Sequence, residues 1–361
     1  MIPLSRPSIT DLDISMVEHA LRSGRLSMGS FLTSFETLMA EQAKVRYAVA
    51  VNSGSSALQL IVEVLGIGAS DEVITTPFSF IASANCIVSN GATPVFVDID
   101  PVSYCLDEEK IETVVTPQTA AILGVDVFGH PCQWERIQKI AQRYDLSVIE
   151  DACEAIGSTY AGRPCGSFGD AACYSFYPNK AMTMGEGGVI LTNDQELAER
   201  CQMLRNQGRT PGSGHLEHQI IGYNYRLGEM NCALGVSQHA RLGEMLAQRE
   251  QVAKWYQAEL AGCPDLILPG STSFVYVIQL GEDRTKEDRD RMLMMLRVQD
   301  IECAKYFPPI HLQPAYAQYG YKRGDFPITE HVADHTIALP FFTDMTEDQV
   351  KTVASALRGA L

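Results

Sequence analysis

One lysine of this chain lies in a segment with very few other charges. Residues 172–190 begin as an apolar strand that ends at Ser175; Pro178 then breaks the strand, and Lys180 follows in a loop of small residues. The next charged residue is Glu186. A lysine removed from water can attack an aldehyde and form a Schiff base. The alternative interpretation is an ordinary solvated lysine on the surface.

An acidic residue follows another apolar strand. Residues 146–149 form a mainly apolar strand; Glu150 and Asp151 follow it directly, and Glu154 comes three residues later. Ligands of open α/β sheets bind at the carboxyl ends of the strands. Asp151 could therefore hold a cationic ring nitrogen through a charge-assisted hydrogen bond. The alternative is an acid that caps a helix.

A third candidate is a glycine- and serine-rich turn. Residues 48–51 form an apolar strand, and a helical period begins near Leu58. Between them, Gly54 allows close approach of the backbone, while Ser55 and Ser56 would present N–H groups and hydroxyls at a helix N-terminus. Such a turn binds anions, although a serine cap without a ligand is the alternative. Neither a Walker loop nor a G-x-G-x-x-G motif is present.

Together these three features meet the needs of one cofactor. Pyridoxal 5′-phosphate (PLP) requires a phosphate site, an acid that faces its ring nitrogen, and a lysine that forms an imine with its aldehyde. Ser55 with Ser56, Asp151 and Lys180 would supply these groups in that order. The combination is far more specific than any one of its parts, and it predicts a PLP enzyme.

Alternating strands and helices must position these residues. Strands are expected at 47–51, 72–75, 93–97, 120–125, 147–150, 172–176 and 189–192, with helices at 57–65, 81–89 and 134–144. This alternation predicts an α/β domain with a mainly parallel sheet flanked by helices. A long helical stretch over 227–260 leads to a strand at 273–280 and helices at 286–299 and 347–357. We therefore expect a large domain over residues 1–250 and a smaller C-terminal α+β domain over 251–361.

The composition excludes several other classes of protein. The 361 residues carry a formal net charge of −16, which argues against nucleic acid or an anionic membrane as a partner. None of the ten cysteines forms a C-x-x-C pair, so the pattern indicates no metal centre. No signal peptide and no apolar run of membrane-spanning length is apparent. A cytoplasmic enzyme with reduced thiols is the expectation.

The runs 51–58, 77–85, 150–157, 175–188 and 222–229 resemble the DegT-type sugar aminotransferases of PLP fold type I. The similarity extends through 306–316 and 339–342, so it covers nearly the whole chain. It implies that Lys180 binds the cofactor as a Schiff base and that Asp151 pairs with the pyridine nitrogen. The other positions that it assigns to the cofactor are Gly54, Ser55, Ser56 and Ser175 for the phosphate turn, Phe80 for stacking, Glu154 near the 3-oxygen, and Asn224 as a phosphate ligand from the neighbouring subunit.

The resemblance also implies an activity. It is the transfer of an amino group from glutamate or glutamine to a keto-sugar, most simply one linked to a nucleotide, in a homodimer with shared active sites. Glu186, Tyr306 and His311 are candidates for substrate contact, with turn or loop packing as the alternative. Other possibilities are a PLP-dependent sugar dehydratase, in which His replaces the lysine, and a non-catalytic regulator. One departure is Asp126, which stands where family members often have His.

Overall fold

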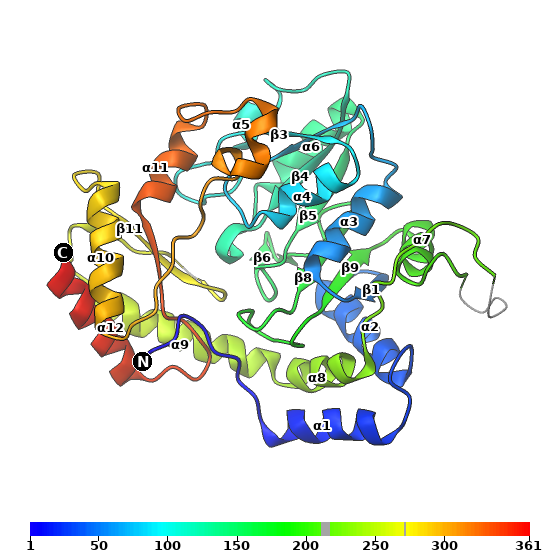
Figure 1. Ribbon diagram of the computed structural model, residues 1–361, viewed down its shortest axis with the longest axis horizontal. Coiled ribbons are helices and arrows are strands. Elements are labelled where there is room, and N and C mark those ends of the chain that lie inside the picture. The colour runs from blue at the N-terminus through cyan, green and yellow to red at the C-terminus, as the bar shows by residue number, and fades with distance from the viewer. Residues whose placement is uncertain (211–216, 271) are drawn as a thin grey trace.

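The computed structural model describes residues 1–210, 217–270 and 272–361. Its centre is a sheet of seven strands in the order β1-β9-β8-β5-β4-β2-β3 (Figure 1). These strands are β1 (Tyr47–Val51), β2 (Glu72–Thr75), β3 (Thr93–Phe96), β4 (Thr119–Val125), β5 (Ser147–Asp151), β8 (Ala171–Ser175) and β9 (Gly188–Thr192). Each coincides within about two residues with a strand that the apolar runs predict. The α/β class is confirmed.

The sheet is mainly parallel, as expected, with one reversal. Strands β2, β3, β4, β5 and β8 pair in parallel. Strand β9 runs antiparallel to both of its neighbours, β8 and β1. All of its residues are buried, so the strand is apolar on both faces and its sequence alone does not indicate its direction.

Helices cover the large sheet and surround a second, smaller sheet. They are α1 (Asp11–Arg22), α2 (Ser30–Ala43), α3 (Gly54–Val64), α4 (Ala82–Ser89), α5 (Glu108–Ile111), α6 (Trp134–Tyr144), α7 (Gln195–Arg205), α8 (Glu229–Ala240), α9 (Leu242–Leu260), α10 (Lys286–Val298), α11 (Pro327–His335) and α12 (Glu347–Ala360), with 3₁₀ turns η1 (Val127–Gly129), η2 (Ile310–Leu312) and η3 (Pro314–Tyr319). The predicted helix at 134–144 is confirmed at both ends. The stretch over 227–260 is not one helix, because a turn at Arg241 separates α8 from α9.

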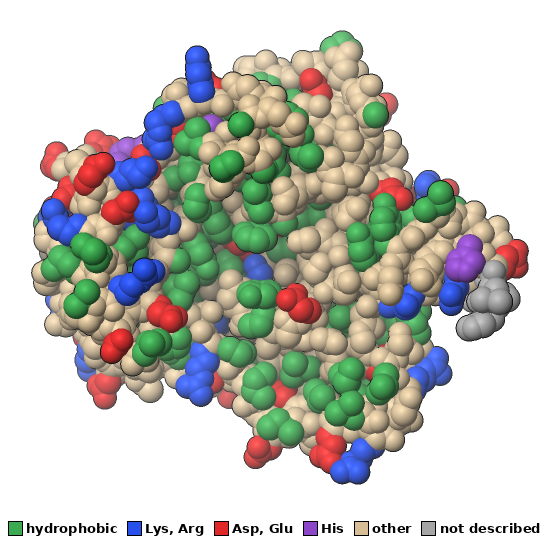
Figure 2. All heavy atoms as spheres, in the orientation of Figure 1, with side chains coloured by type: hydrophobic (Ala, Val, Ile, Leu, Met, Phe, Trp, Pro, Cys, Tyr) green, Lys and Arg blue, Asp and Glu red, His purple; other side chains and the backbone are tan. Residues whose placement is uncertain are grey.

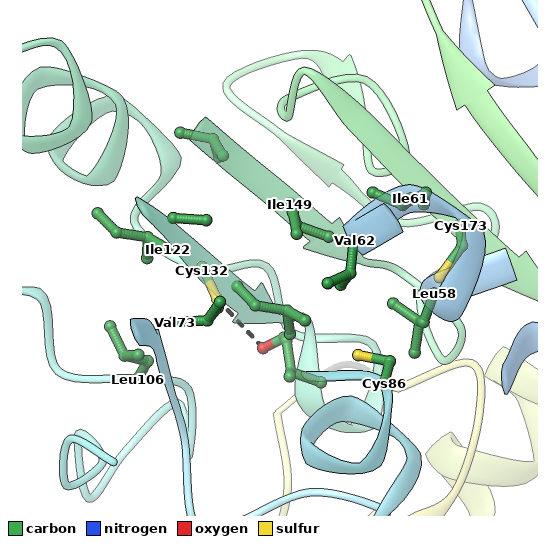
Figure 3. Packing of buried hydrophobic residues seen from close by; sticks show 14 of the residues in the cluster. Leu58, Ile61, Val62, Val73, Cys86, Leu106, Ile122, Cys132, Ile149 and Cys173 are labelled. Carbon is green, nitrogen blue, oxygen red and sulfur yellow. Dashed lines mark hydrogen bonds between the residues drawn. The ribbon is translucent and has the colours of Figure 1, made fainter. Parts of the chain in front are cut away.

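The main hydrophobic core lies between the sheet and the helices that pack on it. Leu58, Ile61 and Val62 of α3 approach Ile149 of β5, and Ile122 of β4 continues the same layer (Figure 3). Apolar residues occupy most positions of α3. A helix that is apolar on nearly all sides must be buried, and this burial fixes the N-terminus of α3 beside the strand ends.

A smaller part of the molecule contains the C-terminal residues. Strands β10 (Leu266–Ile267), β11 (Tyr276–Leu280) and β12 (Thr336–Leu339) form its antiparallel sheet. Its own core includes residues of α9, α10 and α12. The N-terminal segment also reaches it, since Ile2 pairs with Ile301 in a short bridge. Figure 1 shows α9 running from the large part to the small one. A further pair, β6 (Thr159–Tyr160) and β7 (Arg163–Pro164), forms a small hairpin.

None of the helices in the described residues is both long enough and apolar enough to cross a membrane.

Candidate active site

A cavity of about 510 Å³ opens at the carboxyl ends of the central strands. Figure 2 shows the molecule hollowed near its centre, with many hydrophobic side chains around the hollow. Most residues that the sequence singles out line this cavity: Gly54, Ser55, Phe80, Asp151, Glu154, Ser175, Lys180, Glu186 and Tyr306. Ser56, Asn224 and His311 are not part of the lining. Residues more than 250 positions apart in the chain thus converge on one space.

Lys180 lies in the turn that follows β8. Its backbone N–H donates to Tyr177 O at 2.9 Å, which holds the turn closed. Its side chain is 12% exposed, and its Nζ lies 3.9 Å from Oε1 of Glu154. The same Nζ lies 4.1 Å from the ring centroid of Phe274. The amine is therefore enclosed between a carboxyl group and an aromatic face, within the cavity.

Asp151 is the last residue of β5, and its side chain is almost fully buried. Its Oδ2 accepts a hydrogen bond from Oγ of Ser83 at 2.7 Å, and its Oδ1 accepts one from the N–H of Cys153 at 3.2 Å. Sγ of Cys173 also donates to Oδ1 at 3.8 Å, so three donors hold the carboxylate at the floor of the cavity. The alternative role as a helix cap does not apply, because no helix follows β5 directly.

The turn before α3 combines a cap with an open helix N-terminus. Oγ of Ser53 accepts from the N–H of Ser56 at 3.1 Å, and Oγ of Ser56 donates to Asn52 at 2.7 Å. Ser56 is thus engaged in capping, while Ser55 is exposed to the cavity. A Cβ on Gly54 would lie 2.8 Å from Cβ of Ser175, so only glycine fits there. The N-terminus of α3 can receive an anion at this wall.

Glu154 is a buried acid beside Lys180. Its Oε2 accepts from the N–H of Phe128 at 2.9 Å. Burial raises the pKa of Glu154 to about 7, while the neighbouring charge of Lys180 opposes this rise. Its carboxyl group therefore changes charge near neutral pH, at the point where a partner for a phenolic oxygen is expected.

Three predicted residues lie outside the cavity lining. Asn224 is exposed and forms a short bridge with Asn206, whose side chain also accepts from Arg226 at 3.0 Å. Because its predicted role lies in a neighbouring subunit, that role stays a prediction. His311 is buried; its Nε2 lies 3.1 Å from Glu330, and its ring packs against Phe326. This placement corresponds to the loop-packing alternative.

Sequence reasoning missed several residues that line the cavity, among them Ser83, Phe274 and Lys305. Ser83 lies in an ordinary amphipathic stretch, and Phe274 is 94 positions from the lysine that it contacts. No local pattern marks either residue. Only the contacts to Asp151 and Lys180 reveal them.

The α/β fold, with its sheet order and the cavity at the strand ends, defines a PLP enzyme of fold type I. A family model described as the DegT/DnrJ/EryC1/StrS aminotransferase family matches residues 7–358. This chain belongs to that family and is a PLP-dependent aminotransferase.

Individual relatives agree with this assignment. The chain is 40% identical over 342 residues to GDP-perosamine synthase of Caulobacter vibrioides, with 93% of this chain and 91% of the relative covered. Among solved structures, Streptomyces venezuelae DesV has 34% identity and a TM-score of 0.89, with 98% of both chains covered. Helicobacter pylori PseC, an aminotransferase of pseudoaminic acid biosynthesis, has 28% identity and a TM-score of 0.94, with 99% of this chain and 98% of that one covered.

The residues of the cavity fit PLP. A primary amine, a fixed carboxylate and an open helix N-terminus border one space. They suit the aldehyde, the ring nitrogen and the phosphate of the cofactor, respectively. Oδ1 of Asn179, also in the lining, is buried and receives no hydrogen bond from the protein. Such an acceptor is normally satisfied by a ligand or water.

Proposed function

We propose that this chain transfers an amino group from glutamate or glutamine to a keto-sugar that is linked to a nucleotide. The observation that carries the proposal is the placement of Lys180 and Asp151 in one cavity. The relative named GDP-perosamine synthase supports the nucleotide-linked substrate. A ping-pong reaction follows, because donor and acceptor would use the same amine-binding space in turn.

The residues have distinct roles in this proposal. When bound, PLP would supply an aldehyde carbon that can take up an amino group and a ring that can accept electrons. Lys180 anchors the cofactor through Nζ and, when that nitrogen is free, moves a proton between two carbon atoms. Asp151 holds a proton on the ring nitrogen. Ser55, Ser175 and the N–H groups at the start of α3 bind the phosphate.

Lys305 is the residue that we assign to the substrate's phosphates. Among described residues that line the cavity, Lys180 and Lys305 are the basic ones. If Lys180 holds the cofactor, Lys305 remains to meet a second anion. Its Nζ forms an ion pair with Asp290 at 2.7 Å, and both side chains are more than two-fifths exposed. An exposed pair of this kind is weak and can exchange partners.

We also propose a homodimer in which Asn224 contributes to the partner's phosphate site. We further propose that the chain divides into two domains, residues 1–250 and 251–361. The separate hydrophobic core of the C-terminal part supports this division. The mass of the native protein in solution tests the dimer. A mass of one chain would remove the role of Asn224.

The central test replaces the amine. Lys180→Ala should abolish turnover with a keto-sugar nucleotide and glutamate, and should remove the visible absorbance of the PLP imine. Full turnover in this variant would refute the proposal.

Lys305→Met should raise the KM for a nucleotide sugar by about tenfold, which corresponds to the loss of about one charge-assisted hydrogen bond, and should leave kcat nearly unchanged. Lys254→Met, which removes a surface lysine paired with Glu250, is the matched control.

A further inference from the structure

Two carboxylic acids are buried together behind the cavity floor. Asp126 directly follows β4, and Glu150 precedes Asp151 in β5; both are completely buried. The strands pair so that Val125 lies beside Asp151 and Gly124 beside Glu150. Side chains alternate between the faces of a strand, so Glu150 points away from the face that presents Asp151.

Among the described residues, no lysine or arginine pairs with either acid. A carboxyl oxygen of Asp126 lies within 4.8 Å of a carboxyl oxygen of Glu150, and Sγ of Cys165 lies within the same distance of both. Two carboxylates in contact, away from water, repel each other and lose their hydration, so one of them must be neutral. A proton shared between them satisfies both requirements.

The hydrogen bonds indicate which acid carries the proton. Glu150 accepts backbone N–H groups on both oxygens, from Gly166 on Oε1 and from Phe168 at 2.7 Å on Oε2. Oδ1 of Asp126 accepts from the N–H of Cys132 at 2.9 Å and from Nε1 of Trp134 at 3.0 Å. Oδ2 of Asp126 is buried and receives no donor. It is the oxygen with room for a hydrogen.

We propose that Asp126 is a positioning residue. Its Oδ2 carries a proton and donates a hydrogen bond to the carboxylate of Glu150. This bond fixes the strand end that presents Asp151. The N–H of Asp126 donates to the carbonyl of Asp151 at 3.0 Å, so the two strand ends are tied at this point. Loss of the proton would place two negative charges in contact and separate β4 from β5. The carboxylate of Asp151 would move with its strand.

The surroundings support a neutral Asp126. Burial, followed by the charge of Glu150, raises the pKa of Asp126 well above its usual range. The titratable groups that face the pair from the adjoining elements bring no positive charge: they are Cys105, Cys132, Cys165 and Tyr174. Burial also raises the pKa of Cys132, Cys165 and Tyr174.

The first test follows unfolding against pH without added PLP. A carboxyl group whose pKa is raised by folding binds a proton more tightly in the native state. Its contribution to stability is complete at low pH and is lost as the pH rises above about 4. Asp126→Asn keeps the donor to Glu150 and removes the titration. The wild type should therefore lose stability relative to Asp126→Asn between about pH 5 and pH 9.

Glu150→Gln gives the matched control for the position of the proton. A glutamine amide would place its NH2 group against one of the two backbone N–H donors, that of Gly166 or that of Phe168. This variant should be destabilised at every pH, unlike Asp126→Asn. Equal behaviour of the two variants would refute the assignment of the proton to Asp126.

The second test titrates PLP and reads its visible absorbance. Asp126→Ala removes the bond to Glu150 and leaves two donors unpaired, so the Kd for PLP should rise about tenfold. Asp126→Asn should stay within about twofold of the wild type, because the bond is retained. The proposal fails if unfolding of Asp126→Asn keeps the wild-type pH dependence, or if this variant binds PLP as weakly as Asp126→Ala. It also fails if the purified wild type carries one equivalent of metal ion.

The positioning role rests on the proposed role of Asp151, but the unfolding comparison does not. If Asp151 did not bind the cofactor, the pH dependence of unfolding would be unchanged. If Asp126→Ala failed to fold, the comparison of Asp126→Asn with the wild type would still decide.

Discussion

Arg249 of α9 is a buried cation that holds the segment leading into β11. Its Nε donates to Ser273 O and its Nη2 to Phe274 O, both at 2.6 Å. The guanidinium also lies 4.8 Å from the ring centroid of Phe341. Burial lowers the pKa of Arg249 to about 10, which still leaves it charged at neutral pH. Because the ring of Phe274 lies over Nζ of Lys180, we expect Arg249→Met to affect both stability and turnover.

The size of the effect follows from the groups left behind. In Arg249→Met, the carbonyls of Ser273 and Phe274 lose their donors, at a cost of about 1–3 kcal/mol each. Removing a buried guanidinium recovers part of this cost, because a charge no longer has to be desolvated. We expect a net loss of about 2–4 kcal/mol in the free energy of unfolding. A displaced Phe274 ring should also lower kcat by about tenfold, the value of one contact between a cation and an aromatic ring.

Urea unfolding and steady-state turnover measure these two effects. Lys254→Met on the same helix is the control, since its exposed pair with Glu250 should contribute less than about 1 kcal/mol. Phe274→Leu tests whether Arg249 affects Lys180 through the ring of Phe274, because this variant removes the ring and leaves the backbone carbonyl in place. Unchanged stability and turnover in Arg249→Met would refute the reasoning. A normal kcat in Phe274→Leu would show that Arg249 acts through another route.

Three further predictions concern the cavity wall. Burial raises the pKa of Glu154 from 4.5 to about 7, so its protonated form contributes stability that is complete at low pH and lost as the pH rises through about 7. Glu154→Gln should flatten this pH dependence in thermal unfolding between pH 4 and 9. An unaltered profile would contradict the prediction. Gly54→Ala should weaken PLP binding about tenfold, since the new Cβ would lie 2.8 Å from Cβ of Ser175, whereas Gly243→Ala, with open space around it, should leave PLP binding unchanged. Cys153 also lines the cavity. A hydrogen bond with Cys173 lowers the pKa of its thiol, but burial and the charge of Asp151 outweigh it and raise the pKa. Iodoacetamide should therefore modify Cys153 slowly and PLP should protect it; equal labelling with and without PLP, measured by mass spectrometry of the peptides, would contradict this.

Local sequence patterns were sufficient to predict an element's bounds where the element's own apolar residues mark the face that it buries. The apolar run of β1 and the amphipathic period of α6 gave the bounds of both elements. Helices α1 and α2 were not predicted from the sequence. Exposed apolar residues such as Ile14 and Leu21 blur the amphipathic pattern of α1. The turn at Arg241, where α8 ends and α9 begins, also has no proline to mark it, and the nearby Gly243 lies within α9.

The sequence by itself determined the chemistry of the site, because Lys180, Asp151 and the turn at Gly54 each lie in a short motif that a strand end must present. The tertiary structure decided which other groups meet them. Phe274 contacts Lys180, Ser83 fixes Asp151, and the direction of β9 is set by its neighbours. The physical reason is that a motif constrains only residues near each other along the chain. Contacts between distant segments depend on how sheets and helices pack, and no local pattern encodes that packing.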